Sequence, residues 1–204
     1  LHLWGFDVSV NDMKNFRQSG SKTPGHPEYG HTHGIEITTG PLGQGIANAV
    51  GFAMAGKYAQ NLLGKDVINH KVYCLCGDGD LQEGISYEAT ATAGHLKLDN
   101  LVIIYDSNSI TIEGDTSIAW SENVKKRFQA IDFEVIEIDG NNFDQIDKAF
   151  VQAKNSTMPV LIIAKTVIAK GAVTLEGSHH SHGAPLGVDE IKQAKIKAGF
   201  NPDV

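Results

Sequence analysis

The sequence of 204 residues lacks several features that would mark other classes of protein. No apolar stretch approaches the roughly 20 residues needed to cross a bilayer, and no segment resembles a signal peptide. The formal charge is −7 and the lysines are scattered, whereas a nucleic-acid-binding protein usually carries a basic patch. We therefore expect neither a membrane nor a nucleic acid as a partner.

Cysteine is also scarce, and the two residues present, Cys74 and Cys76, are separated by one position. Two thiols so placed are poorly arranged for a disulfide and too few for a closed zinc site. They fall in the apolar run 72–76 (VYCLC), where alternate residues of a strand point the same way. We expect two buried free thiols, which suit a reducing compartment, and hence a cytoplasmic protein.

The remaining sequence indicates one α/β domain over residues 1–204. A hydrophobic content of 41% is typical of a globular chain. Apolar runs predict strands at 72–76, 101–105, 133–138 and 160–165, and helical spacing predicts helices at 12–18, 42–63, 85–96, 123–130, 143–154 and 188–198. Loops are expected at 21–34 and 169–187. Alternating strands and helices favour a mostly parallel sheet with helices on both faces.

A short polar motif follows the first predicted strand. Gly77, Asp78 and Gly79 come directly after it, and Asn108 comes shortly after the second strand. A right-handed strand–helix–strand crossover brings the carboxyl ends of both strands to one edge of the sheet. Open α/β folds bind their ligands at that edge. We therefore expect Asp78 and Asn108 to lie in one site.

The chemistry of these residues suits a divalent cation bound to a phosphate group. Magnesium prefers an octahedral shell of oxygens, and Asp78, Asn108 and the carbonyl of Ile110 could supply three of them. Gly77 and Gly79 have no Cβ, which would allow close approach of a diphosphate and unusual turn conformations.

Glycines in this arrangement also occur in ordinary turns and in other phosphate-binding motifs. Gly-Asp-Gly by itself is an ordinary turn sequence, and the spacing to Asn108 is what favours a binding site. Gln82 stands where a dinucleotide fingerprint requires glycine, and Gly64-Lys65-Asp66 lacks the hydroxyl residue that ends a P-loop. These two phosphate-binding motifs are therefore excluded.

The segment from Asp78 to Asn108 resembles the thiamine diphosphate motif, and its surroundings resemble the transketolase family. The matching segments are 1–7 (LHLWGFD), 21–28 (SKTPGHPE), 38–55 (TTGPLGQGIANAVGFAMA), 77–88 (GDGDLQEGISYE), 105–114 (YDSNSITIEG) and 178–186 (SHHSHGAPL). They span nearly the whole chain in one order, so the resemblance is more specific than any single motif.

The resemblance implies a thiamine-diphosphate-binding fold and an activity. It implies transfer of a two-carbon ketol unit from a ketose phosphate to an aldose phosphate, as in the pentose phosphate pathway, with thiamine diphosphate and Mg²⁺ (or Ca²⁺ or Mn²⁺). A homodimer or a pyrimidine-binding partner would complete the site. Because Leu1 falls within an apolar segment and the pyrimidine-binding and C-terminal domains of the family have no counterpart here, we expect a chain truncated at both ends and inactive alone.

The resemblance also assigns roles to individual residues. It implies His26 and His182 as catalytic residues, Gly40, Pro41, Leu42, Gly79, Asn108 and His182 as cofactor-binding residues, Asp78, Asn108 and Ile110 as metal ligands, and Glu83 and Glu88 as support at a subunit interface. Without it, loop histidines would be solvated bystanders, and the glutamates would belong to a solvated helix face. The many glycines of 42–63 suggest that a helix or the cofactor comes close.

Three other functions remain open from the sequence. One is a different thiamine-diphosphate enzyme, of the dihydroxyacetone synthase or deoxyxylulose-phosphate synthase type, although the motifs around His26 and His182 favour transketolase. Another is a non-catalytic cofactor-binding or assembly subunit. The least favoured is a transition-metal site formed by His31, His33, His179 and His180.

Overall fold

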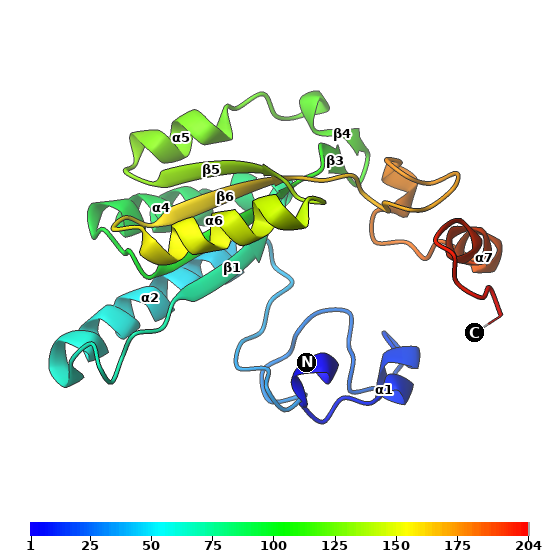
Figure 1. Ribbon diagram of the computed structural model, residues 1–204, viewed down its shortest axis with the longest axis horizontal. Helices are drawn as coiled ribbons and strands as arrows, with labels where there is room; N and C mark the ends of the chain where they lie inside the picture. The colour runs from blue at the N-terminus through cyan, green and yellow to red at the C-terminus, as the bar shows by residue number, and fades with distance from the viewer. Residues whose placement is uncertain (204) are drawn as a thin grey trace.

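The computed structural model describes residues 1–203, which contain a four-stranded sheet in the order β1-β2-β6-β5 (Figure 1). Its strands are β1 (Val72–Cys76), β2 (Leu101–Ser107), β6 (Val160–Lys165) and β5 (Glu134–Asp139). Every neighbouring pair is parallel. A small antiparallel hairpin, β3 (Ile110–Thr111) with β4 (Gly114–Asp115), follows β2. The predicted parallel sheet is confirmed.

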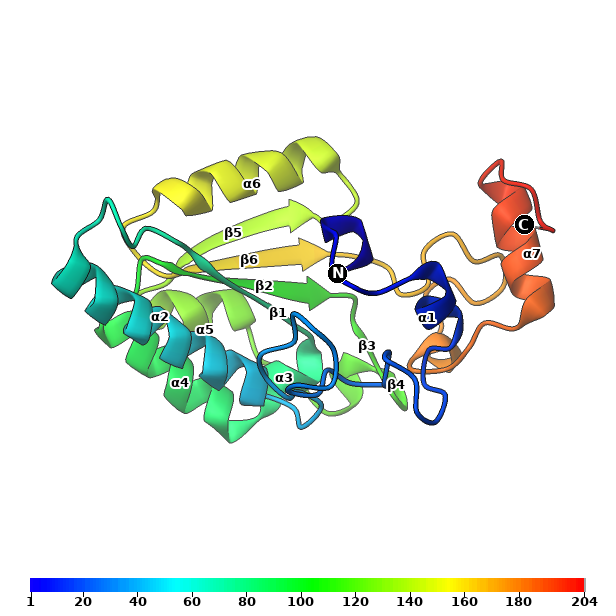
Figure 2. The same cartoon turned by 90° about the horizontal axis from the view of Figure 1, so that it is seen from below.

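Helices cover both faces of this sheet, as predicted. One face packs against α2 (Gln44–Leu63), α4 (Gly84–His95) and α5 (Val124–Ala130), and the other packs against α6 (Phe143–Asn155) (Figure 2). The larger core cluster joins α2, α4 and α5 to the sheet and includes Ile46, Ala93, Ile103 and Phe128. The smaller cluster includes Val102, Ala153 and Ile162 under α6. Each face therefore has its own apolar core.

The edge strand β1 shows the expected alternation of side chains. Cys74 and Cys76 are buried and unbridged, whereas Tyr73 and Leu75 on the opposite face are 50% and 75% exposed. The thiols point into the core shared with α2, which confirms the prediction for both cysteines.

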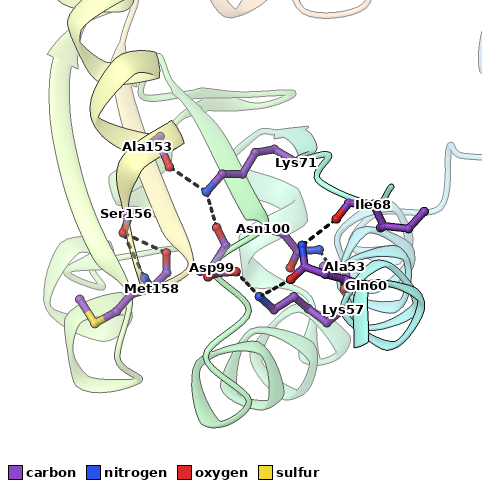
Figure 3. Close-up of polar contacts among 10 residues, drawn as sticks. All are labelled: Ala53, Lys57, Gln60, Ile68, Lys71, Asp99, Asn100, Ala153, Ser156 and Met158. Atoms are coloured by element: carbon purple, nitrogen blue, oxygen red, sulfur yellow. Dashed lines mark hydrogen bonds and ion pairs between the residues drawn. The ribbon is translucent and has the colours of Figure 1, made fainter. Parts of the chain in front are cut away.

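Polar contacts fix the amino ends of the strands (Figure 3). Lys71, just before β1, donates to the carbonyls of Asp99 and Ala153, and Lys57 of α2 pairs with Asp99 at 2.7 Å. Burial lowers the pKa of Lys71, and the nearby Asp99 opposes this effect. Asn100 donates to the Ala53 carbonyl at 3.0 Å. Loops and helices are thus tied together at the edge opposite Asp78.

Several predicted elements differ in their bounds. The helix predicted at 12–18 is α1 (Val10–Lys14), because Ser9 and Asp12 form a capping box that starts it earlier. The first strand and the one at 160–165 have the predicted bounds. The closing helix is α7 (Val188–Lys197).

Other elements were not predicted. They are α3 (Asp78–Gln82), the β3–β4 hairpin, and the short 3-10 helices η1 (His2–Trp4), η2 (Thr116–Ile118) and η3 (His179–Ser181). Both α1 and α7 lie beyond the carboxyl ends of the strands (Figure 2). Within residues 1–203, no helix combines the length and apolar character that crossing a membrane requires.

Candidate functional site

A cleft of about 460 Å³ opens at the carboxyl ends of β1 and β2. It is lined by Leu42, Gly77, Asp78, Gly79, Asp80, Asp106, Asn108, Ile110, Thr111, Ile112, Glu113 and His182. Asp78 follows β1 and Asn108 follows β2, and both line this cleft, so their predicted convergence is observed. Leu42, Gly79, Ile110 and His182, which were also predicted for the site, line the same cleft.

The strand β1 passes directly into the short helix α3, which begins at Asp78. Asp80, in the first turn of α3, accepts hydrogen bonds from the Gly77 amide at 2.9 Å and the Gly43 amide at 3.0 Å. An acidic residue three positions after the helix cap commonly reaches back in this way. Sequence reasoning missed Asp80, and this spacing was the signal that could have found it.

The two glycines beside Asp78 do not have the backbone conformation that was predicted, whereas close approach of a diphosphate stays a prediction. Gly77 is extended, with φ of −111°, and Gly79 belongs to helix α3, so neither adopts a left-handed conformation. The prediction of unusual turn conformations is wrong. A Cβ on Gly79 would instead lie 3.0 Å from Leu42 Cδ1. Glycine at this position leaves room for the Leu42 side chain in the wall of the cleft.

Asp78 is a buried carboxylate, with 5% of its surface exposed. The hydroxyl of Tyr105, on β2, donates a hydrogen bond to its Oδ1. Burial raises the pKa of Asp78, the Tyr105 bond opposes this, and the negative charges of Asp106 and Asp115 raise it further. A carboxylate in such a position is stabilised in its charged form by a bound cation.

Asn108 has both ends of its amide in defined contacts. Its Nδ2 donates to Asp106 Oδ2 at 3.2 Å, and its Oδ1 accepts from the Ile110 amide at 2.9 Å. Between them, Ser109 adopts a left-handed conformation with φ of 62°. This tight turn places the Asn108 side chain and the Ile110 backbone on the same wall of the cleft.

The charge of the cleft fits a divalent metal bound with a diphosphate. Four of the lining residues described are acidic, namely Asp78, Asp80, Asp106 and Glu113, and none is lysine or arginine. A diphosphate would be repelled by these carboxylates unless a cation lay between them. Carboxylate, amide and carbonyl oxygens are the ligands that Mg²⁺ and Ca²⁺ prefer.

A transition-metal site would require a cluster of His, Cys, Asp or Glu side chains. Over residues 1–203, no group of three or more His, Cys, Asp or Glu is arranged to hold a metal. The predicted set of Asp78, Asn108 and Ile110 contains only one such side chain, so it would not form such a group. His179 and His180 stack on each other, with ring centroids 4.1 Å apart, and the ring of His31 contacts the Ser21 carbonyl at 2.8 Å.

The other residues predicted for the site lie outside this cleft. His26 lines a different pocket, of about 270 Å³. Gly40 packs against the His26 ring, because a Cβ on Gly40 would lie 3.0 Å from His26 Cγ. The φ of 133° at Gly40 also favours glycine. Pro41 is exposed and does not line the cleft. The roles of His26, Gly40 and Pro41 stay predictions.

Glu83 and Glu88 also lie away from the cleft. Glu83 is the cap of α4 and Glu88 lies within it, and both are exposed. Gly43 packs closely against Glu83, since a Cβ on Gly43 would lie 2.8 Å from Glu83 Cβ. Their exposure leaves them free for a partner, and the interface role stays a prediction.

Comparison with known proteins identifies the family. The family model described as transketolase, thiamine diphosphate binding domain, matches residues 1–204. The chain belongs to this transketolase family. It is 53% identical over 200 residues to the transketolase of Geobacillus stearothermophilus, covering 96% of this chain and 30% of that protein. It is 53% identical over 209 residues to transketolase 1 of Saccharomyces cerevisiae, covering 100% and 30%.

Solved transketolases share the fold of this chain. The Campylobacter jejuni enzyme is 66% identical with a TM-score of 0.97, covering 100% of this chain and 32% of that one. A Pichia stipitis transketolase, solved in complex with sedoheptulose-7-phosphate, is 44% identical with a TM-score of 0.94, covering 99% and 31%. The predicted thiamine-diphosphate-binding fold is confirmed. The chain spans about a third or less of the length of these relatives.

Proposed function

We propose that this chain is the diphosphate-binding part of a transketolase. The enzyme would transfer a two-carbon ketol unit from a ketose phosphate to an aldose phosphate in the cytoplasmic pentose phosphate pathway. The observation that carries the proposal is the acidic cleft in which the buried carboxylate of Asp78 and the amide of Asn108 converge. Family membership and the sugar phosphates bound to the Pichia stipitis relative support the substrate class.

The cleft residues divide into a metal end and a cofactor wall. Asp78, Asn108 and the Ile110 carbonyl would hold Mg²⁺, or Ca²⁺ or Mn²⁺, and Gly79 and His182 would face the diphosphate. When bound, thiamine diphosphate supplies the carbon nucleophile and the electron sink for the two-carbon unit.

The remaining predicted residues would contact the thiamine or the substrate rather than the metal. Leu42, with Gly40 and Pro41, would contact the thiamine. His26 and His182 would orient substrate hydroxyl groups or move protons at them, since a neutral imidazole carries both a hydrogen-bond donor and an acceptor.

A second subunit or a pyrimidine-binding partner would complete the site. Large apolar side chains on α2 are exposed, among them Phe52 at 48%, Tyr58 at 68% and Leu62 at 66%. Exposed apolar side chains along one helix favour a protein partner. Glu83 and Glu88, on the neighbouring α4, would lie at that interface.

The proposal is tested by titrating Mg²⁺ and thiamine diphosphate into full-length protein by calorimetry. Asp78→Asn keeps the size of the side chain and removes its charge, and we expect at least tenfold weaker metal-dependent binding, equal to about 1.4 kcal/mol. Asp147→Asn, at an exposed position of α6 on the far face, is the matched control and should bind as the wild type. Unchanged binding by Asp78→Asn would refute the assignment of the cleft.

Activity separates the alternative functions. We expect turnover of xylulose 5-phosphate with ribose 5-phosphate by the full-length protein. Turnover only with formaldehyde or with pyruvate and glyceraldehyde 3-phosphate would favour the other two synthase types. Association with a partner and no cofactor-dependent turnover would favour an assembly subunit.

A further inference from the structure

Two consecutive residues of β2 contact the two side chains proposed as metal ligands. Tyr105 lies on one face of the sheet and donates to Asp78. Asp106 lies on the other face and accepts from Asn108. Successive side chains of a strand point to opposite faces, so one strand end reaches a ligand on each side. Asp106 also lines the cleft, but it is neither a proposed metal ligand nor a proposed cofactor contact.

Asp106 is held from two directions. Its Oδ2 accepts from Asn108 Nδ2 at 3.2 Å, and its Oδ1 accepts from the hydroxyl of Thr166. Thr166 directly follows β6, the strand paired with β2, and its amide donates to the Ser107 carbonyl at 3.2 Å. The carboxylate therefore links Asn108 to the segment that follows the neighbouring strand β6.

These contacts decide which way the Asn108 amide faces. An amide group has a donor end and an acceptor end, and its orientation follows from its hydrogen-bond partners. With Nδ2 on the Asp106 carboxylate, Oδ1 is left to meet the Ile110 amide and retains a second lone pair. The reversed amide would set its oxygen against a carboxylate and its NH₂ group against the Ile110 N–H. Both contacts would be repulsive.

We propose that Asp106, anchored by Thr166, is a positioning residue that presents the Asn108 oxygen to the divalent cation. The inference rests on the proposed metal and diphosphate function of the cleft. Outer partners of metal ligands commonly contribute about 10- to 100-fold to metal affinity. Asp106 acts through Asn108, and its negative charge is a separate contribution that the experiment must distinguish.

Two substitutions separate orientation from charge. Thr166→Val removes the hydroxyl that anchors Asp106 and keeps the carboxylate, whereas Asp106→Leu removes the carboxylate itself. For full-length protein titrated with Mg²⁺ at saturating thiamine diphosphate, we expect Thr166→Val to weaken Mg²⁺ binding about tenfold and Asp106→Leu more strongly. The double variant should bind no more weakly than Asp106→Leu alone, because both changes break one chain of contacts.

Controls exclude a general loss of structure. Thr166→Ser restores the hydroxyl and should restore affinity. Thr92→Val removes a threonine hydroxyl at an exposed position of α4 that does not line the cleft, and this variant should bind Mg²⁺ as the wild type does. In Thr166→Val, the NMR resonances of the Asn108 side-chain amide should shift while the melting temperature stays unchanged. A merely structural role of Thr166 would not give this combination.

The outcomes distinguish this inference from the proposed function. If Asp78→Asn abolishes metal binding and Thr166→Val binds normally, Asp106 acts through its charge alone and the inference is wrong. A failure of Thr166→Ser to restore affinity would also overturn it. If Asp78→Asn itself binds normally, the proposed function fails first.

Discussion

Asp80 and Gly43 are 37 positions apart in the sequence, yet Asp80 Oδ1 accepts a hydrogen bond of 3.0 Å from the Gly43 amide. The second carboxylate oxygen of Asp80 accepts from the Gly77 amide at 2.9 Å. One side chain thus fixes the starts of α2 and α3 together. Leu42 and Asp78, which are the sequence neighbours of these two amides, both line the cleft.

Substitution of Asp80 should therefore loosen two elements at once. Asp80→Ala leaves the amides of Gly43 and Gly77 without their acceptor, and Gly43 is buried. An unsatisfied buried donor costs about 1–3 kcal/mol, so we expect the free energy of unfolding to fall by about that amount or more in urea titrations. Asp80→Asn retains one acceptor oxygen and should lose less. Equal stability of all three proteins would show that these bonds contribute nothing.

Much of the sheet follows from local sequence. The apolar runs 72–76 and 160–165 predict β1 and β6 with their observed bounds, since strands of a parallel sheet are continuous apolar segments. Only β6 is buried on both faces, because β1 is an edge strand. Asp78 and Asn108 follow from the same logic, because the carboxyl ends of parallel strands share one edge. The resemblance to transketolases supplied Leu42 and His182, which local sequence does not connect to the cleft.

What could not be predicted depends on contacts between distant segments. The link from Asp80 to Gly43 and the one from Thr166 to Asp106 join residues that only the folded chain brings together. The contact of position 79 with Leu42 has the same origin, and only the predicted turn conformation of Gly79 is wrong. The capping box at Ser9 is the exception, because Ser9 and Asp12 show its spacing in the sequence itself.

The buried carboxylate of Asp78 should make stability depend on pH in metal-free protein. Burial raises its pKa above the ordinary value of 3.8. A carboxyl group with a raised folded-state pKa contributes stability that is present below the unfolded pKa and is lost as pH rises through the folded pKa. Metal-free protein should therefore be destabilised by this group at neutral pH, where the charge is uncompensated.

Asp78→Asn removes that pH-dependent cost. With a chelator present, we expect the variant to be more stable than the wild type at neutral pH and by a smaller margin at about pH 4, because a raised pKa leaves more of the carboxyl group protonated there than at neutral pH. Urea titrations at the two pH values measure the difference. With Mg²⁺ and thiamine diphosphate added, the order should reverse, because binding stabilises only the wild type. A variant that is less stable at neutral pH without metal would contradict the burial argument.

Two helical glycines offer a matched test of packing. A Cβ on Gly94 of α4 would lie 1.8 Å from the Ile131 carbonyl oxygen, whereas a Cβ on Gly51 of α2 meets nothing within 4 Å. Alanine is favoured over glycine within a helix by about 1 kcal/mol, so Gly51→Ala should stabilise the chain by up to that amount. Gly94→Ala should destabilise it by about 3 kcal/mol or more, because α5 must move away. Thermal unfolding of the two variants measures both effects.

The same pair also reports on partners of α2. If another subunit packs closely on the exposed side of this helix, Gly51→Ala should weaken association while stabilising the separated chain. Sedimentation at several concentrations separates these effects. If Gly51→Ala destabilises the separated chain, the added methyl group must clash within the chain itself, which would contradict the open surroundings of Gly51.

The thiols of β1 should be slow to react in the folded protein. Burial raises the pKa of Cys74 to about 11 and that of Cys76 well above its ordinary value, and Asp80 acts in the same direction on both. The thiolate is the reactive form, so at about pH 8 very little of either thiol is ionised in the folded chain, and both side chains are covered. Alkylation by iodoacetamide should be slow until urea unfolds the protein, after which both residues should react together. Rapid labelling of folded protein would mean that β1 separates from α2, since only that motion exposes the face on which both sulfurs lie.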